Sequence, residues 1–276
     1  MPDEGVSITD EVLAAMRSTP SQRTLEILCA VVRHLHDLIR EVGLADSEWQ
    51  TAIDFLTRTG QMCTSQRQEF ILLSDVLGVT MLVDAVNSRR DETATGNSVL
   101  GPFFREDRPT LPDGYDISGG LSGATLSVRA RIVDTEGRPV SGALFDVWHS
   151  DGDGHYDSDI ADLNGTAMRG LFRSSDDGYV SFRSIAPASY PIPSDGPVGE
   201  LMRASNRSVM RPAHVHVRIV APGFSTLTTM VFRKGDPYLD CDPVVGVKPA
   251  LIADFSSDDS GDSEQLEYTF VLQPRG

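Results

Sequence analysis

Hydrophobic residues recur at helical spacing in the first third of the chain. Between residues 25 and 39, and again between residues 70 and 81, apolar side chains follow one another at intervals of three and four. This spacing places them on one face of an α-helix. The pattern predicts four or five helices up to about residue 90. Several residues are suitable N-caps for them, namely Thr9 or Asp10, Ser21 and Ser47.

After about residue 95 the apolar positions alternate with a period of two. Residues 126–132 alternate apolar and polar side chains, which predicts a strand with one buried face. Further strands are expected at residues 143–148, 179–182, 214–220, 226–232 and 266–272, with Gly-, Pro- and Asp-rich turns between several of them. Many short strands with such turns indicate a β-sandwich. We therefore predict an α+β protein, helical over residues 1–95 and a mainly antiparallel β-sandwich over residues 96–276.

Two histidines share one face of the predicted strand 214–220. Side chains two apart on a strand point the same way, so His214 and His216 can direct their imidazoles at one point. His34 and His36 have the same spacing in a predicted helix, where two residues span about 200° of arc and the side chains diverge. Neutral imidazole is the commonest metal ligand. The strand pair is therefore either half of a metal site or two ordinary hydrogen-bonded histidines.

Two tyrosines lie in loops of the same region. Tyr156 ends a glycine-rich turn, and Tyr190 stands among prolines that each fix their own φ. Either tyrosine can be a packing residue, and spacing alone does not bring them to the histidines. If all four residues converge, a strongly Lewis-acidic trivalent cation would keep the phenols ionised. Two phenolates and two imidazoles suit Fe(III) better than Zn(II).

Composition narrows the classes of function. Acidic residues outnumber basic ones 40 to 24, and the net charge of −16 disfavours binding to nucleic acid or to anionic membranes. No run of about 18 apolar residues is present to span a bilayer. The three cysteines form no C-x-x-C pair, which is typical of reduced thiols in the cytoplasm. No nucleophile elbow or phosphate-binding glycine loop occurs, so hydrolase chemistry is not expected.

Several blocks of residues resemble the intradiol ring-cleavage dioxygenases, and most of all the hydroxyquinol 1,2-dioxygenases. The blocks in the strand-rich part are residues 146–151 leading to 154–156, residues 190–199, residues 211–216, and residues 236–240 running into 245–248. Those in the helical part are residues 67–75 and 98–103. The blocks occur in the same order as in that family and are distributed over nearly the whole chain.

The resemblance implies a mononuclear non-haem Fe(III) held by Tyr156, Tyr190, His214 and His216. In this family a vicinal diol binds the iron and displaces the ligand that corresponds to Tyr190. O2 then attacks the electron-rich ring, which opens between the two hydroxylated carbons. Arg211 corresponds to an arginine near the iron that can stabilise negative charge developing on the ring. The alternative for Arg211 is a purely structural role.

The resemblance also implies a substrate pocket. The residues at pocket-lining positions are Leu72, Asp75, Val99, Leu100, Gly101, Pro102 and Val244. Asp75 could accept a hydrogen bond from a third ring hydroxyl, which catechol lacks, or it could be an ordinary surface or capping aspartate. Met230 stands where catechol-cleaving relatives typically carry glutamine. A thioether cannot donate the hydrogen bond that an amide can, so we expect a changed substrate preference rather than lost activity.

These expectations together predict Fe(III)-dependent cleavage of hydroxyquinol (benzene-1,2,4-triol) by O2 to maleylacetate. Catechol or a chlorinated or alkylated catechol, giving a cis,cis-muconate, is the alternative substrate. A non-catalytic β-sandwich binding module is an alternative of a different class. The resemblance further implies a homodimer formed through the N-terminal helices, in some cases with a lipid at the interface. The apolar stripe of residues 25–39 suits that interface and an intramolecular core equally well.

Overall fold

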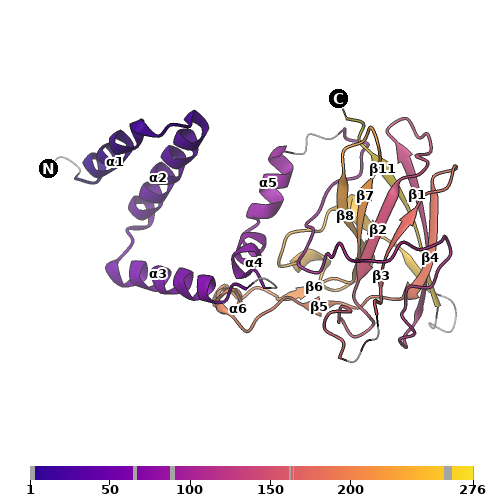
Figure 1. Cartoon of the computed structure of the whole chain (residues 1–276). Coiled ribbons are helices and arrows are strands. Elements are labelled where there is room, and N and C mark those ends of the chain that lie inside the picture. Colours follow the sequence, from indigo (N-terminus) through magenta and orange to yellow (C-terminus); the bar gives the residue numbers. More distant parts are fainter. Residues whose placement is uncertain are drawn as a thin grey trace. The chain divides into compact units, whose positions relative to one another are not determined.

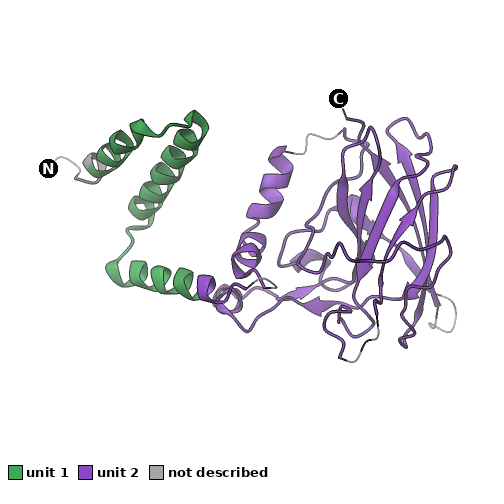
Figure 2. Ribbon diagram, viewed as in Figure 1, with its two compact units in different colours: residues 1–58 green, residues 59–276 purple. Residues whose placement is uncertain are grey.

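The computed structural model describes residues 4–64, 67–87, 91–161, 163, 165–257 and 263–275. The chain divides into two compact units, residues 1–58 and 59–276 (Figure 2). The first unit is helical, and all of the strands belong to the second unit (Figure 1). No helix in the described part of the chain is long and apolar enough to cross a bilayer.

The first unit contains three α-helices and one turn of 3₁₀-helix. Their bounds are α1 Glu4–Ala15, η1 Met16–Ser18, α2 Gln22–Val42 and α3 Asp46–Gln61, the last of which runs across the unit boundary. Ser21 is the N-cap of α2, as predicted, and its hydroxyl accepts a hydrogen bond from the Thr24 amide at 3.2 Å. The N-caps predicted at Thr9 or Asp10 and at Ser47 are wrong, because both helices begin earlier in the chain.

Helix α2 buries none of its side chains in the described structure. Its exposed apolar residues include Ile27, Val31, Leu35, Leu38 and Val42, each between 47% and 57% exposed. The stripe predicted from the sequence lies on this helix as well: its members Leu28, Leu35 and Ile39 are 38–54% exposed, and Leu25, Cys29 and Val32 are partly covered in the described part of the chain. His34 and His36 lie on this helix, as the helical periodicity of their segment predicted.

Two sheets and two helices make up most of the second unit. Helices α4 (Glu69–Val76) and α5 (Val79–Asn87) complete the predicted helical region. One sheet has the order β10-β11-β1-β4, formed by Phe255–Ser257, Ser263–Leu272, Thr125–Asp134 and Tyr179–Ile185. The other has the order β3-β2-β7-β8-β9, formed by Arg169–Arg173, Leu144–His149, His214–Val220, Leu227–Arg233 and Ile252–Ala253. One apolar cluster contains residues of both sheets, so they pack face to face as a sandwich.

The sheets are mixed rather than purely antiparallel. Strand β1 pairs with β11 in parallel, and β8 pairs with β9 in parallel, whereas the remaining pairs are antiparallel. The C-terminal strand β11 thus returns beside β1 after most of the second unit has intervened. A parallel pair requires such a long connection, which alternation within a single strand does not reveal.

A small two-stranded sheet lies outside the sandwich. Strand β5 (Tyr190–Pro191) pairs antiparallel with β6 (Met210–Arg211), and Tyr190 stands opposite Arg211. Between them in sequence runs α6 (Pro197–Ala204), which begins with proline at a position where no amide hydrogen bond is required. Two further 3₁₀ turns, η2 (Leu239–Cys241) and η3 (Pro249–Leu251), complete the described elements.

Candidate metal centre

Four side chains from separate parts of the second unit meet in its interior. The hydroxyl oxygens of Tyr156 and Tyr190 are 3.1 Å apart, and the Tyr190 oxygen is 3.4 Å from Nε2 of His214. Nε2 of His214 is in turn 3.1 Å from Nε2 of His216. Two ligands of one ion, each about 2.0–2.1 Å from it, lie about 3 Å from one another. The three separations between neighbouring donor atoms therefore match those between ligands of one metal ion.

Strand alternation directs the two histidines to the same side of β7. His214 and His216 are each 1% exposed, while Val215, Val217 and Ile219 face the apolar cluster between the sheets. The predicted strand has the observed bounds, His214–Val220. The period of two thus separates core-forming side chains from donor side chains along one short segment.

The tyrosines are fixed by local structure. Tyr190 begins β5, which is paired with β6, and it is 7% exposed. Tyr156 follows a turn in which the Asp151 carboxylate accepts hydrogen bonds from the amides of Asp153 and His155 at 2.9 and 2.8 Å.

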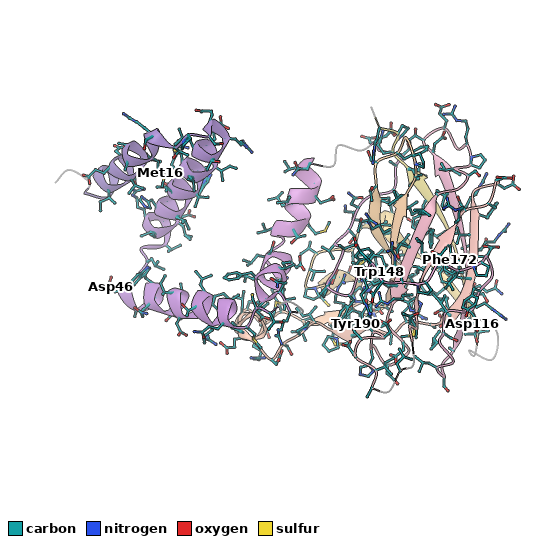
Figure 3. The ribbon with its side chains drawn as sticks, in the orientation of Figure 1. Met16, Asp46, Asp116, Trp148, Phe172 and Tyr190 are labelled. Atoms are coloured by element: carbon teal, nitrogen blue, oxygen red, sulfur yellow. The ribbon has the colours of Figure 1, made fainter. Side chains whose placement is uncertain are left out.

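Aromatic rings cover two of the four donors. The Phe103 ring stacks on Tyr156 at 3.9 Å between centroids, and the Trp148 ring stacks on His216 at 4.8 Å. Trp148, Tyr156 and Tyr190 form one buried cluster, and Figure 3 labels Trp148 and Tyr190 within the strand-rich unit. The stacking limits the ring orientations and keeps water away from the donor atoms.

The two histidines are oriented in different ways. Nδ1 of His214 donates to the carbonyl of Pro212 at 2.6 Å, so its proton lies there and Nε2 keeps its lone pair. Nδ1 of His216 has no hydrogen-bond partner in the described chain. His216 is instead packed between the Trp148 ring and Gly101, where an added Cβ would come within 3.1 Å of the imidazole Cε1. Gly101 also has φ +75°, which only glycine adopts readily.

Burial keeps the two imidazoles and the Tyr156 phenol uncharged in the protein alone. Desolvation lowers the pKa of His214 well below its usual value, and the nearby Arg211 lowers it further. Desolvation and the neighbouring His214 lower the pKa of His216 in the same way. Burial also raises the pKa of Tyr156 well above its usual value. Neutral imidazole is the form that binds metals, and a bound cation would favour the ionised phenols, so this donor set fits a strongly Lewis-acidic ion.

Arg211 lies next to the four donors. Its Nη1 is 3.3 Å from Nε2 of His214, and its Nη2 is 3.3 Å from the sulfur of Met230. The Asp242 carboxylate accepts from Nε at 3.1 Å and from Nη2 at 3.4 Å. Burial alone would lower the pKa of Arg211, but the Asp242 charge raises it above its usual value, so the guanidinium stays charged. The structure thus places a fixed positive charge beside the donor atoms.

The apolar pocket residues gather in one cluster. Val99, Met230 and Val244 are at most 4% exposed and belong to the same cluster, against which Leu72 packs. Leu100 is 40% exposed, and Pro102 is exposed as well. Gly101, which lies between them in sequence, packs against the His216 imidazole.

Asp75 lies on α4 and is buried. It is 6% exposed, and its Oδ1 has no hydrogen-bond partner in the described chain. Burial raises the pKa of the Asp75 carboxyl, while its hydrogen bond with Thr80 and the charge of Arg211 act in the opposite direction. Because buried polar atoms are normally paired, this oxygen is a site where a ligand hydroxyl would be accommodated. The alternative of an exposed surface aspartate is wrong.

Three contributors to the site were not singled out from the sequence. Trp148 and Phe103 cover the donors, and both lie inside blocks that carried the family resemblance. Asp242 holds Arg211 but has no distinguishing sequence pattern. No group of three or more His, Cys, Asp or Glu that could bind a metal occurs among the described residues. The candidate centre described above differs from such clusters because two of its four donors are tyrosines.

Comparisons with known proteins cover both parts of the chain. The family model "Catechol dioxygenase N terminus" matches residues 21–95, and the model "Dioxygenase" matches residues 101–274. The 6-chlorohydroxyquinol 1,2-dioxygenase of Cupriavidus pinatubonensis is 48% identical over 97% of this chain and 97% of its own length. The hydroxyquinol 1,2-dioxygenase of a Rhizobium species is 46% identical over 89% of this chain and 84% of its own.

A solved structure agrees with these matches. The hydroxyquinol 1,2-dioxygenase of Pseudomonas putida superposes with a TM-score of 0.92 at 41% identity, covering 98% of this chain and 99% of the other. The helices followed by a two-sheet domain are therefore the architecture of a known group of enzymes. With both family models matched and relatives above 40% identity over most of its length, the chain belongs to the intradiol ring-cleavage dioxygenases and is an enzyme of that family.

Proposed function

We propose that this enzyme opens hydroxyquinol between its two vicinal hydroxyls with O2, giving maleylacetate. The observation that carries the proposal is the buried convergence of two phenols and two imidazoles beside a fixed guanidinium. The names of the relatives from Cupriavidus, Rhizobium and Pseudomonas support hydroxyquinols as the substrate class. We assign Tyr156, Tyr190, His214 and His216 as the ligands of one Fe(III) per chain.

When bound, Fe(III) would supply a Lewis acid that binds both vicinal oxygens of the diol and makes the ring reactive toward O2. Tyr190 would hold the iron together with the other three donors, and its phenol oxygen is assigned as the group that would take the proton of a substrate hydroxyl. That oxygen lies 3.4 Å from Nε2 of His214. Tyr156 stays in place under the stacked Phe103 ring.

Arg211 is assigned as the residue that stabilises negative charge on the opening ring. Asp242 fixes its guanidinium through Nε and Nη2, which leaves Nη1 directed at the donor atoms. Because the group is 3% exposed, its charge is little screened by water. A charge held in place before the reaction costs no reorganisation when negative charge develops.

Asp75 supports hydroxyquinol over catechol. Its unpartnered Oδ1 offers a hydrogen bond that only a third ring hydroxyl would complete. The carboxylate can accept that bond, and the protonated acid can donate one. The apolar residues Leu72, Val99, Met230 and Val244, together with Leu100, Gly101 and Pro102, are proposed to line the remainder of the pocket.

The test compares oxygen uptake on hydroxyquinol, 6-chlorohydroxyquinol, catechol and 4-chlorocatechol, with the product spectra recorded. We expect the purified protein to be red from tyrosinate-to-Fe(III) charge transfer, and kcat/KM to be highest for a triol. A preference for catechol, with a muconate product, would establish the alternative substrate. A colourless preparation that stays inactive after iron loading would contradict the enzyme assignment and favour the non-catalytic binding module.

We also propose that residues 1–95 mediate homodimer formation and residues 96–276 carry catalysis. The exposed apolar face of α2 supports a second copy of the chain as its partner, with a lipid as a further ligand of that face. The free thiols of Cys29, Cys63 and Cys241 support a reducing, cytoplasmic location.

A further inference from the structure

One carboxylate contacts the residues that directly precede two of the proposed ligands. Oδ2 of Asp236 accepts a hydrogen bond from the Ser189 hydroxyl at 2.5 Å and another from the Ala213 amide at 2.9 Å. Ser189 precedes Tyr190 and Ala213 precedes His214. Asp236 is 8% exposed, so these bonds are largely shielded from water. A single oxygen atom thus links the chain segments of a tyrosine and a histidine donor.

The carboxylate lies where the backbone pairing of β5 and β6 ends. Tyr190 stands opposite Arg211 and Pro191 opposite Met210, so the antiparallel register would next place Ser189 opposite Pro212 and then Ala188 opposite Ala213. Hydrogen-bonded pairs alternate along an antiparallel ladder, and the Ile192 amide donates to the Val209 carbonyl at 2.9 Å, so the Ala213 amide is the next one due to donate across the ladder. That amide donates to Asp236 instead, and the same carboxylate oxygen accepts from the Ser189 side chain on the other strand.

Asp236 is itself held in place on both sides. Its Oδ1 accepts a hydrogen bond from the amide of Tyr238 at 2.9 Å. This bond from the amide two residues on closes a turn, with Pro237 at its centre. The turn follows β8, whose last residue Arg233 donates its amide to the Ala213 carbonyl at 2.9 Å. Ala213 is therefore fixed through both of its backbone polar groups. With three donors, the buried carboxylate is well satisfied.

We propose that Asp236 is a positioning residue of the metal centre, which sets the separation between the Tyr190 and His214 donors. This proposal rests on the proposed ferric site. The contact is made at Ser189 and not at the Tyr190 ring, so the ring can move when a diol binds while its backbone stays fixed. The same contact holds the start of β7, from which His214 and His216 project.

The test replaces Asp236 by Asn and Asp134 by Asn in the full-length iron-loaded protein. Asp134 is a matched control, because it is 6% exposed and its Oδ1 accepts from the amide two residues on, that of Glu136, at 2.9 Å. Its other hydrogen bonds come from Arg138, which adjoins no proposed ligand. In Asp236→Asn, an amide that keeps the Tyr238 bond turns its NH₂ toward the Ala213 N–H, and two donors then face each other.

Three quantities are measured for each variant: the tyrosinate-to-Fe(III) absorption maximum, the rate of iron release to a chelator, and Tm. We expect Asp236→Asn to shift the absorption maximum and to release iron about 10–100-fold faster, the usual effect of losing a partner behind a metal ligand. Asp134→Asn should lower Tm without changing the other two. The proposal is overturned if Asp236→Asn lowers Tm but leaves the absorption maximum and iron release as in the wild type.

Ser189 provides a second test that does not disturb a buried charge. Ser189→Ala should accelerate iron release, and Ser189→Thr, which keeps the hydroxyl, should restore the wild-type rate. Because Asp236→Asn already disturbs the hydrogen bond with Ser189, combining it with Ser189→Ala should add little to the effect of Asp236→Asn alone. Fully multiplicative effects on iron release would contradict the proposal, and Ser189→Ala alone decides it if Asp236→Asn does not fold. A wild-type protein that binds no iron would instead contradict the proposed function.

Discussion

Individual residues of this site show how burial prepares a polar centre for a ligand. His214 donates one ring hydrogen to the Pro212 carbonyl and keeps its other nitrogen for the centre. Asp75 keeps an unpaired buried oxygen, which costs free energy that a bound hydroxyl would recover. In both residues the free protein already holds the polar atom in the orientation that a ligand requires. We therefore expect substrate preference to depend on Asp75, whose Oδ1 has no hydrogen-bond partner in the described chain.

Replacement of Asp75 tests this link. Asp75→Ala should lower kcat/KM for hydroxyquinol by about tenfold, the loss expected for one buried hydrogen bond. Catechol lacks the third hydroxyl, so its kcat/KM should stay close to the wild-type value. Asp75→Asn can still form a hydrogen bond with a hydroxyl, so its kcat/KM for hydroxyquinol should lie between those of the wild type and Asp75→Ala. The assignment fails if Asp75→Ala leaves the preference for hydroxyquinol over catechol unchanged in steady-state oxygen uptake.

The residues that the sequence could indicate are those whose own chemistry is distinctive. Histidines two apart on a strand and tyrosines in rigid loops can be recognised in the sequence as candidate ligands. The family resemblance then assigned all four to one metal site. Asp242 and Asp236 act through partners that come close only in the folded chain. Their sequence neighbours give no sign of those partners. Contacts between residues distant in sequence explain why such supporting groups were missed.

Among the elements, β7 is the one on which core and site depend together. Alternate residues face the apolar cluster between the sheets and the candidate metal centre. A slip of one residue would exchange the two sets, so burial of the valines fixes the direction of the histidines. The strand therefore couples the stability of the sandwich to the geometry of the donors.

Substitution on the core face of β7 should change the stability of the sandwich without changing the geometry of the donors. Ile219 is fully buried in the sandwich, so Ile219→Ala should lower the free energy of unfolding by about 2–5 kcal/mol, and Ile219→Val by about 0.5–1.5 kcal/mol. Chemical denaturation measures both values. The absorption maximum of the iron-loaded protein should stay unchanged in Ile219→Val. A shifted maximum in that variant would show that the core face also sets donor geometry.

Elements with a clear period were predicted well, and short ones were not. The predicted strands at residues 126–132 and 214–220 correspond to β1 and β7, and five α-helices precede residue 90 in the described chain. Strands β5 and β6 contain two residues each, too few to show any period. Their pairing exists because tertiary contacts bring two loops together. The parallel partners of β1 and β8 were missed for the same reason.

At the scale of the whole molecule, the two units differ in how they bury apolar surface. The second unit has a core with residues from both sheets. In the first unit, α2 has no buried side chain, and several of its apolar residues are about half exposed. Contiguous exposed apolar surface of this kind is typical of an interaction site. This contrast supports the proposed homodimer.

Charge placed on the α2 face should disrupt that dimer. Leu35→Glu and Leu38→Glu introduce carboxylates into the proposed interface, and size-exclusion chromatography with light scattering should show monomers at concentrations where the wild type is dimeric. Arg23→Glu is the control, since its side chain is 78% exposed and lies outside the apolar stripe. This variant should remain dimeric. A wild-type protein that is monomeric throughout would contradict the homodimer proposal.

The sequence by itself determined the helical and strand-rich regions, the common face of His214 and His216, and the family. These features depend on local periodicity and on residue types in a fixed order, both of which are written along the chain. No local pattern brings Tyr156 and Tyr190 to those histidines; the family resemblance implied that meeting, and the tertiary structure gives its distances. Only the tertiary structure decided that Asp242 holds Arg211 and that Asp236 joins two ligand segments. Such contacts depend on the packing of segments far apart in sequence, and no local pattern specifies which distant partners will meet.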